Sequence, residues 1–220
     1  MGLEKTNESK RMLLEALRKG KSNKSIFSGL PRRPERYEFI PLSSEQKRMW
    51  MFWADNKETT IFHLTDFFSI RGYINVARLE EVINEVVNEY DVFKFTFHYV
   101  HEKVVIREED KALLDYRYLE RKTEALKQCR TICDEPFDLE NGPLVRAVVV
   151  KSNGDELTLG IAMHHIISDG WSINIFLSRI IEKYYETNEI HHKKAIGFID
   201  YLFYRQQEEY KQALEKDMQY

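Results

Sequence analysis

The stretch Met163-His164-His165-Ile166-Ile167-Ser168-Asp169-Gly170-Trp171-Ser172 places two adjacent histidines, an acid and a glycine within seven residues. The residues before it, 157–163, are apolar enough for a buried strand. After it, apolar residues recur at the spacing of one helix face, namely Ile173, Phe176, Leu177, Ile180, Ile181 and Tyr184. The pattern predicts that the histidines lie at a strand end, on a loop that leads into a helix. Such loops commonly carry catalytic groups.

The two histidines are expected to point in different directions. Adjacent residues of an extended segment point to opposite faces, so one imidazole can face a cleft while the other faces the interior. An imidazole in a cleft can accept a proton from an attacking hydroxyl, thiol or amine near neutral pH. Asp169 is either a catalytic acid or a partner for a buried cation. Gly170 indicates a position that needs unusual dihedral angles or close approach of a substrate.

The HHxxxDG pattern of residues 164–170 resembles the signature of the chloramphenicol acetyltransferase-like acyltransferases. Within that group, three further segments are similar to motifs of nonribosomal peptide synthetase condensation domains, and they follow the same order. These segments are residues 41–50 (PLSSEQKRMW, similar to PLSxxQxRMW), 137–147 (FDLENGPLVRA, similar to FDLxxGPLxRA) and 198–201 (FIDY, similar to the start of YxDYAxW). The resemblance covers residues 37–220.

One segment departs from the family pattern. Residues 90–97 (YDVFKFTF) stand where the family has HExLRTxF, with Tyr90 for His, Asp91 for Glu and Lys94 for Arg. In the family, the charged residues of this motif support the geometry of a loop. Their replacement here is therefore expected to change packing details and not the assignment to the family. The histidine pair argues against the heterocyclising subfamily, which carries aspartates there. Epimerisation domains share HHxxxDG and stay an alternative, although the Asp-Gly-Trp-Ser continuation is more similar to condensation domains.

The expected fold class is α/β, a chloramphenicol acetyltransferase-like α/β sandwich that forms one lobe of a two-lobed condensation domain. The periodicity predicts strands over residues 60–70, 93–99, 104–107, 145–151 and 156–163, and helices over 43–54, 75–90, 122–133, 171–186 and 196–217. Ser43, with Gln46 three residues later, predicts a capping box at the start of the first helix. The second helix is expected to bury an apolar stripe of Leu79, Val82, Ile83, Val86 and Val87. All the matched motifs belong to the family's N-terminal lobe. We therefore divide the chain into a leader of residues 1–36 and a lobe of residues 37–220. The leader contains a linker and a predicted helix over residues 8–19, which either docks a partner or packs on the domain.

Composition excludes several classes of protein. The formal net charge is −3, from 33 basic and 36 acidic residues, which gives no reason to expect nucleic acid or a membrane as a partner. No apolar run reaches the roughly 18 residues of a membrane span. The polar first residues do not resemble a signal peptide, so we expect a cytoplasmic protein. Cys129 and Cys133 are interpreted as reduced core residues, and we expect no metal site.

The resemblance implies that His165 is the catalytic residue. It would act in the attack of an amine on a thioester carbonyl. Three roles stay open: to take the amine proton as a base, to orient the amine, or to stabilise the tetrahedral intermediate. His164 and Asp169 are expected to have structural roles at the site. Asp169 is expected to pair with Arg146 on a neighbouring strand. Because breaking one side of a buried pair costs about 3–5 kcal/mol, loss of Asp169 is expected to damage folding at least as much as chemistry.

Three further residues are expected to shape the site by the same resemblance. Gly170 is expected to leave room for the phosphopantetheine arm or the thioester. Arg48 is expected either to line the route of the carrier arm or to be an ordinary surface arginine. Trp171 is expected to be a core residue that caps the following helix.

The implied function is amide-bond formation between a carrier-bound acyl or peptidyl thioester and a carrier-bound aminoacyl amine. The partners are upstream and downstream carrier proteins, whose phosphopantetheine carries the substrates, together with the C-terminal lobe of the same domain. No cofactor is expected inside the domain. An isolated lobe would lack half of its cleft, so activity is expected of the whole domain. Two alternatives stay open, a self-standing trimeric chloramphenicol acetyltransferase-like acyltransferase and a non-catalytic carrier-docking module.

Overall fold

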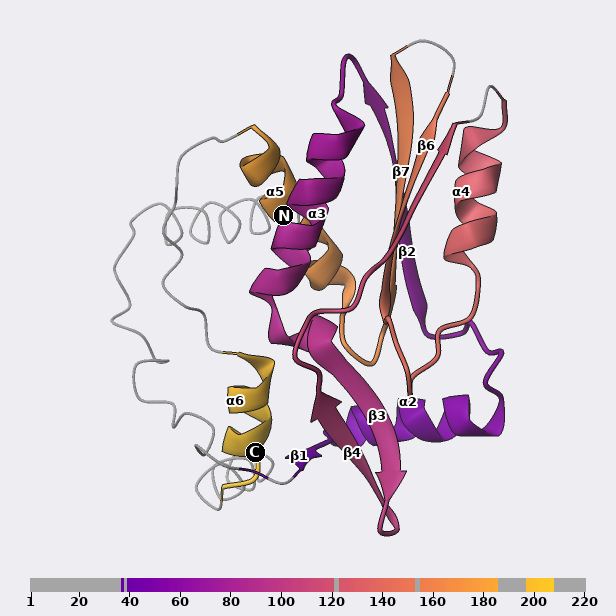
Figure 1. The fold of residues 1–220 in the computed structure, drawn as a ribbon. Helices are drawn as coiled ribbons and strands as arrows, with labels where there is room; N and C mark the ends of the chain where they lie inside the picture. Colours follow the sequence, from indigo (N-terminus) through magenta and orange to yellow (C-terminus); the bar gives the residue numbers. More distant parts are fainter. Residues whose placement is uncertain (1–36, 38, 121–122, 153–154, 186–196, 208–220) are drawn as a thin grey trace, which may run out of the picture. The chain divides into compact units, whose positions relative to one another are not determined.

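The computed structural model describes residues 37, 39–120, 123–152, 155–185 and 197–207, where strands and helices interleave along the chain (Figure 1). The larger sheet of this described part has the strand order β2 (His63–Arg71), β7 (Glu156–His164), β6 (Val145–Lys151) and β5 (Asp115–Glu120). Its neighbouring strands run antiparallel, except that β5 is parallel to β6. The smaller sheet is antiparallel, with the order β1 (Ile40–Pro41), β4 (Lys103–Glu108) and β3 (Phe95–Val100).

Helices cover both faces of the larger sheet. Helix α4 (Ala125–Cys133) packs against β6 and β7, whereas α3 (Val76–Glu89) and α5 (Gly170–Tyr184) pack together on the other side (Figure 1). Strands β6 and β7 are buried over almost their whole length, because both of their faces are covered. Helix α2 (Ser44–Asp55), the 3-10 helix η2 (Asp91–Lys94) and α6 (Phe198–Tyr204) complete the described elements.

Local sequence explains where these helices form. The predicted apolar stripe of α3 is buried, with Leu79, Val82, Ile83, Val86 and Val87 at 4% exposure or less. Helix α2 begins with the predicted capping box: the Ser43 hydroxyl accepts the Gln46 N–H at 3.1 Å, and the Ser43 N–H donates to Gln46 Oε1 at 3.0 Å. These caps use backbone N–H groups that the first turn of a helix leaves without partners.

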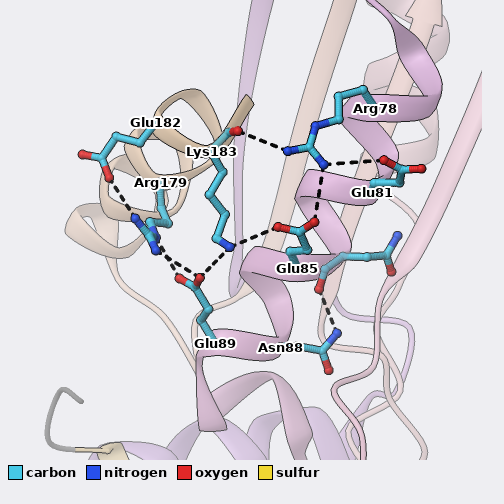
Figure 2. A network of polar contacts seen from close by, with 9 residues as sticks. Arg78, Glu81, Glu85, Asn88, Glu89, Arg179, Glu182 and Lys183 are labelled. Carbon is cyan, nitrogen blue, oxygen red and sulfur yellow. Dashed lines mark hydrogen bonds and ion pairs between the residues drawn. The ribbon is translucent and has the colours of Figure 1, made fainter. Parts of the chain in front are cut away.

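An ion-pair network links α5 to α3 (Figure 2). The carboxylate of Glu89 on α3 accepts from Arg179 at 2.8 Å and from Lys183 at 3.0 Å, both on α5. Lys183 also reaches Glu85 at 3.0 Å. Burial opposes ionisation of Glu89, but the hydrogen bonds from the two cations outweigh it and lower its pKa. The network fixes α5, the helix that follows the histidine pair, against α3.

Most of the predicted elements are confirmed, and the fold is the expected α/β sandwich. The predicted strands correspond to β2, β3, β4, β6 and β7, and the predicted helices to α2, α3, α4 and α5. Two strands were not predicted, the two-residue β1 and the edge strand β5. In the described part of the predicted 196–217 helix, α6 covers only Phe198–Tyr204. The leader of residues 1–36, with its predicted helix over 8–19, lies outside the described residues, so the division at residues 36 and 37 stays a prediction.

Two findings bear on the predictions from composition. Cys129 and Cys133 are both free and fully buried, as predicted for reduced core residues. Among the helices of the described ranges, none has the length and apolar character needed to cross a membrane.

Candidate functional site

The histidine pair lies where the sequence predicts, at the end of a buried strand. His164 is the last residue of β7, residues 165–169 form a loop, and α5 begins at Gly170. His164 is fully buried, whereas His165 is half-buried. The two side chains therefore have different surroundings, as expected for neighbours at a strand end. We call residues 165–169 the histidine loop.

The hydrogen bond of His165 fixes its neutral tautomer. Nδ1 of His165 lies 2.7 Å from the carbonyl oxygen of Ser168. Because a carbonyl only accepts, Nδ1 must carry the proton, and Nε2 of the neutral ring then holds a lone pair. The backbone N–H of His165 donates to the carbonyl of Phe62 at 2.7 Å, which anchors the residue beside β2. His165 is thus held in a form whose Nε2 can accept a proton.

His164 has the opposite tautomer. Its Nδ1 accepts the backbone N–H of Ile166 at 3.1 Å, so in the neutral ring Nε2 carries the proton. Burial, followed by the neighbouring rings of His63 and His165, lowers the pKa of His164 to about 3. The lone pair of His164 is already used inside the fold. A structural role for His164 therefore accords with its burial and its bonding.

The family-like segment 41–50 and the histidine loop meet through a buried glutamine. Nε2 of Gln46 on α2 donates to the carbonyl of Ile166 at 2.9 Å. Gln46 is 4% exposed, and its Oε1 completes the capping box with Ser43. The sequence indicated only the capping role. The contact with the histidine loop depends on tertiary packing, and the position of Gln46 within the family-like segment 41–50 was the available signal.

The expected pair of Asp169 with Arg146 is wrong. Oδ1 of Asp169 accepts the Ser172 backbone N–H at 2.9 Å and the Ser172 hydroxyl at 2.7 Å, so Asp169 is the N-cap of α5. The hydrogen bonds from Ser172 lower the pKa of this exposed carboxyl. The physical reason for the difference is the free N–H groups of the first turn of α5, which the carboxylate satisfies locally.

Arg146 binds a different set of groups. Its Nε donates to Asp115 on β5 at 2.6 Å, and its Nη1 donates to the carbonyls of Ile132 and Glu135 at 2.9 and 2.8 Å. The guanidinium is buried and lies 4.7 Å from the ring centre of Phe137. Arg146 therefore supports the sheet and the end of α4, and its support of the site is indirect.

The remaining predicted residues lie at the surface. Trp171 is 78% exposed, so the expectation of a core residue is wrong; the buried face of α5 begins with Ile173 and Phe176. Gly170 has no positive φ, which excludes the unusual-dihedral explanation. A Cβ atom there would meet nothing within 4 Å, so the space beside Gly170 is open. Arg48 is exposed on α2, and its role along a carrier arm stays a prediction.

The family-like segments 90–97 and 198–201 also contact each other. The carboxylate of Asp91 on η2 accepts the backbone N–H groups of Phe198 and Ile199 at 3.3 and 3.2 Å. Asp91 thus satisfies the first turn of α6. The acid at the position of the family's Glu therefore has a structural role, as the resemblance implied for this motif. The partner was not predicted, because it lies far along the chain.

No metal site is formed within the described ranges. Among those residues, no group of three or more His, Cys, Asp or Glu side chains is placed to hold a metal ion.

Comparison with known proteins identifies the family. The family model "Condensation domain" matches residues 36–220. The chain belongs to the condensation domain family. Curated relatives include gramicidin S synthase 2 of Aneurinibacillus migulanus, which is 30% identical over 185 residues, covering 83% of this chain and 4% of the relative. Tyrocidine synthase 2 of Brevibacillus parabrevis is 32% identical over 154 residues, covering 70% of this chain and 4% of the relative. The chain thus spans a small part of these relatives.

Solved condensation domain structures share the fold. The starter condensation domain of rhizomide synthetase RzmA matches with a TM-score of 0.61 and 18% identity, over 67% of this chain and 38% of the other. The X-domain in its complex with OxyB from teicoplanin biosynthesis matches with a TM-score of 0.70 and 24% identity, over 81% of this chain and 40% of the other. These likenesses support the sandwich fold of the family.

Proposed function

We propose that this chain is the histidine-bearing lobe of a condensation domain that joins a carrier-bound acyl or peptidyl thioester to a carrier-bound aminoacyl amine. The tautomer of His165 carries the proposal. Its Nδ1 is occupied by the Ser168 carbonyl at 2.7 Å, which leaves the Nε2 lone pair for a substrate. The lone pair of His164 is occupied by the Ile166 N–H, so His164 is not equivalent to His165.

The proposed reaction transfers one acyl group. The amine nitrogen attacks the thioester carbonyl carbon, a C–N bond forms and the C–S bond breaks. The amine proton passes to Nε2 of His165, and the departing thiolate takes a proton back, which regenerates the neutral ring. A neutral ring with a free lone pair suits a base or an amine-orienting acceptor. Stabilisation of an oxyanion by His165 would instead need a donor at Nε2.

Other residues are assigned supporting roles in this proposal. Asp169 caps α5 directly after Ser168, so the cap orients the carbonyl that fixes His165. The open space beside Gly170 leaves room for the phosphopantetheine arm of a carrier protein. Arg48 is exposed and available to a carrier. We further propose that the C-terminal lobe of the domain completes the cleft. A cytoplasmic location is also proposed, which the free Cys129 and Cys133 support.

The test measures amide formation by the full-length protein. Acyl-coenzyme A donors and aminoacyl N-acetylcysteamine thioesters serve as probes, and the amide product is detected by mass spectrometry. His165→Ala is expected to slow the reaction by about 10²–10⁴. The control is His101→Asn, because His101 is exposed in the β3–β4 turn at φ 47, a conformation that Asn tolerates.

The same assay separates the alternatives. A His165→Ala protein that keeps the wild-type rate would overturn the role of His165. A full-length wild-type protein that forms no amide but binds loaded carriers would support a docking module instead. A trimer in solution, with acyl transfer to small acceptors, would support the self-standing acyltransferase.

A further inference from the structure

A third histidine lies beside the histidine pair. His63, the first residue of β2, is directly opposite His164 in the pairing of β2 with β7. The two ring centroids are 6.1 Å apart, and the His63 ring also packs against Phe137 at 4.7 Å. Both ring nitrogens of His63 and Nε2 of His164 are buried without a protein hydrogen-bond partner in the described ranges. Three polar ring atoms thus lie buried near one another, at the strand end that precedes the histidine loop.

The hydrogen bonding of His164 leaves its Nε2–H group in need of an acceptor. Nε2 of His164 carries a proton, because Nδ1 accepts from Ile166. A neutral His63 ring has one unprotonated nitrogen, which is an acceptor. A buried donor without an acceptor is unfavourable, and a water molecule that bridges the two rings removes that penalty. We propose that His63 is a positioning residue for His165: one bridging water molecule accepts the hydrogen bond from Nε2 of His164 and donates to the unprotonated nitrogen of His63.

A short chain of hydrogen bonds connects His164 to the ring of His165. The carbonyl of His164 accepts the Ser168 hydroxyl at 3.0 Å, and the Ser168 carbonyl in turn accepts from Nδ1 of His165 at 2.7 Å. Phe62, the neighbour of His63, accepts the backbone N–H of His165. A shift of His164 would therefore move the carbonyl that sets the tautomer of His165.

His63 has to be neutral to accept a hydrogen bond. The charged groups that face it are Arg146 from β6 and Asp134 at the end of α4, and the titratable ring of His164 faces it from β7. Burial, followed by the positive charge of Arg146, lowers the pKa of His63 to about 4, and Asp134 opposes this shift. His63 is therefore neutral at pH 7, the form that the inference requires.

The test compares His63→Leu with His63→Asn in the full-length protein. This inference rests on the proposed function, so the same amide-forming assay is used. His63→Leu is expected to lower kcat roughly ten- to a hundredfold, with KM changed less than about twofold, because the binding surface is intact. His63→Asn keeps an acceptor and is expected to restore most of the rate. The control is His98→Leu, which removes a half-buried ring that contacts Thr96 on β3, a strand of the smaller sheet.

Two results would overturn the inference. One is a wild-type kcat in His63→Leu; the other is an equal loss in the Leu and Asn variants. If His63→Leu does not fold, His63→Met and His63→Gln give the same comparison with side chains of equal length. His165→Ala separates this inference from the proposed function. If His165→Ala is slow and His63→Leu is not, only the role of His63 fails, whereas wild-type activity in His165→Ala removes the proposed function itself.

Discussion

The Ser168 carbonyl lies 2.7 Å from Nδ1 of His165, and this contact sets the chemistry that His165 can perform. It places the proton of the neutral ring on Nδ1 and the lone pair on Nε2. The neighbouring His164 has the reverse arrangement, because its Nδ1 accepts the Ile166 N–H at 3.1 Å. Two adjacent histidines thus differ in tautomer as well as in burial, and the surrounding backbone accounts for the difference.

Removal of the Asp169 side chain should weaken the domain moderately. Asp169→Ala loses the N-cap of α5, which typically costs about 0.5–2 kcal/mol of unfolding free energy. Asp169→Asn should cost less, because Asn is also a good N-cap. Urea unfolding of the two variants and of the wild-type protein measures the difference. A loss of about 3–5 kcal/mol, the size expected when a buried ion pair is broken, would contradict this account.

Loss of the Gln46 amide should affect both stability and activity. Gln46→Leu leaves the buried Ile166 carbonyl without its donor, which is expected to cost about 1–3 kcal/mol. The histidine loop should also move, so the rate of amide formation should fall. Lys47→Leu is the matched control, because Lys47 is exposed on the same helix and should change stability by less than about 0.5 kcal/mol. Equal stability of the two variants would refute the role given to Gln46.

Among the charged residues substituted in these tests, Arg146 is expected to give the largest loss of unfolding free energy. Arg146→Met removes the donor to Asp115 and to two carbonyls at the end of α4, and is expected to cost about 3–5 kcal/mol. Arg107→Met is the control, since Arg107 is exposed on β4. Thermal or urea unfolding gives the comparison. A cost for Arg146→Met no larger than that of the control would show that the buried network is not important for stability.

Lowering the pH should reduce the stability of the domain at pH values above those at which its carboxyl groups become protonated. Burial lowers the pKa of His164 to about 3 and that of His63 to about 4, whereas unfolded histidines titrate near 6.5. The unfolded chain therefore binds protons first, and stability falls as the pH falls below about 6.5. For His164 the loss is up to about 1.4 kcal/mol per pH unit. Unfolding at pH 7.5, 6 and 5 measures the slope, which should be shallower in His63→Asn. A slope unchanged by that substitution would be inconsistent with a neutral buried His63.

The sequence was sufficient for features that depend on local patterns. The apolar spacing of α3 and α5, the capping box at Ser43 and the strand–loop–helix setting of the histidines were all predicted. Interactions between distant segments were not. Asp115 meets Arg146 because β5 and β6 pair in parallel with these two residues opposite each other, and no local pattern specifies that register. Strand β5 itself has many polar and charged residues, which obscured the alternation of apolar and polar side chains that indicates a strand.

The same limit applies to the site. The motif identified His164 and His165, but the position of His63 depends on the register of β2 with β7. Large aromatic residues are usually buried, which favours a core position for Trp171, yet it falls on the exposed face of α5. The N-cap position of Asp169 could have been predicted from the sequence, since an acid stands directly before a predicted helix with Ser172 three residues later.

The most direct test of the account is the tautomer of His165 in solution. Side-chain nitrogen NMR of the chain labelled with ¹⁵N-histidine, at a pH near 7.5, distinguishes protonated from unprotonated ring nitrogens, and His165→Gln assigns its signals among the seven histidines. We expect a proton on Nδ1 of His165 and on Nε2 of His164. A proton on Nε2 of His165 would contradict it, because the nitrogen proposed to take the amine proton would then already be occupied.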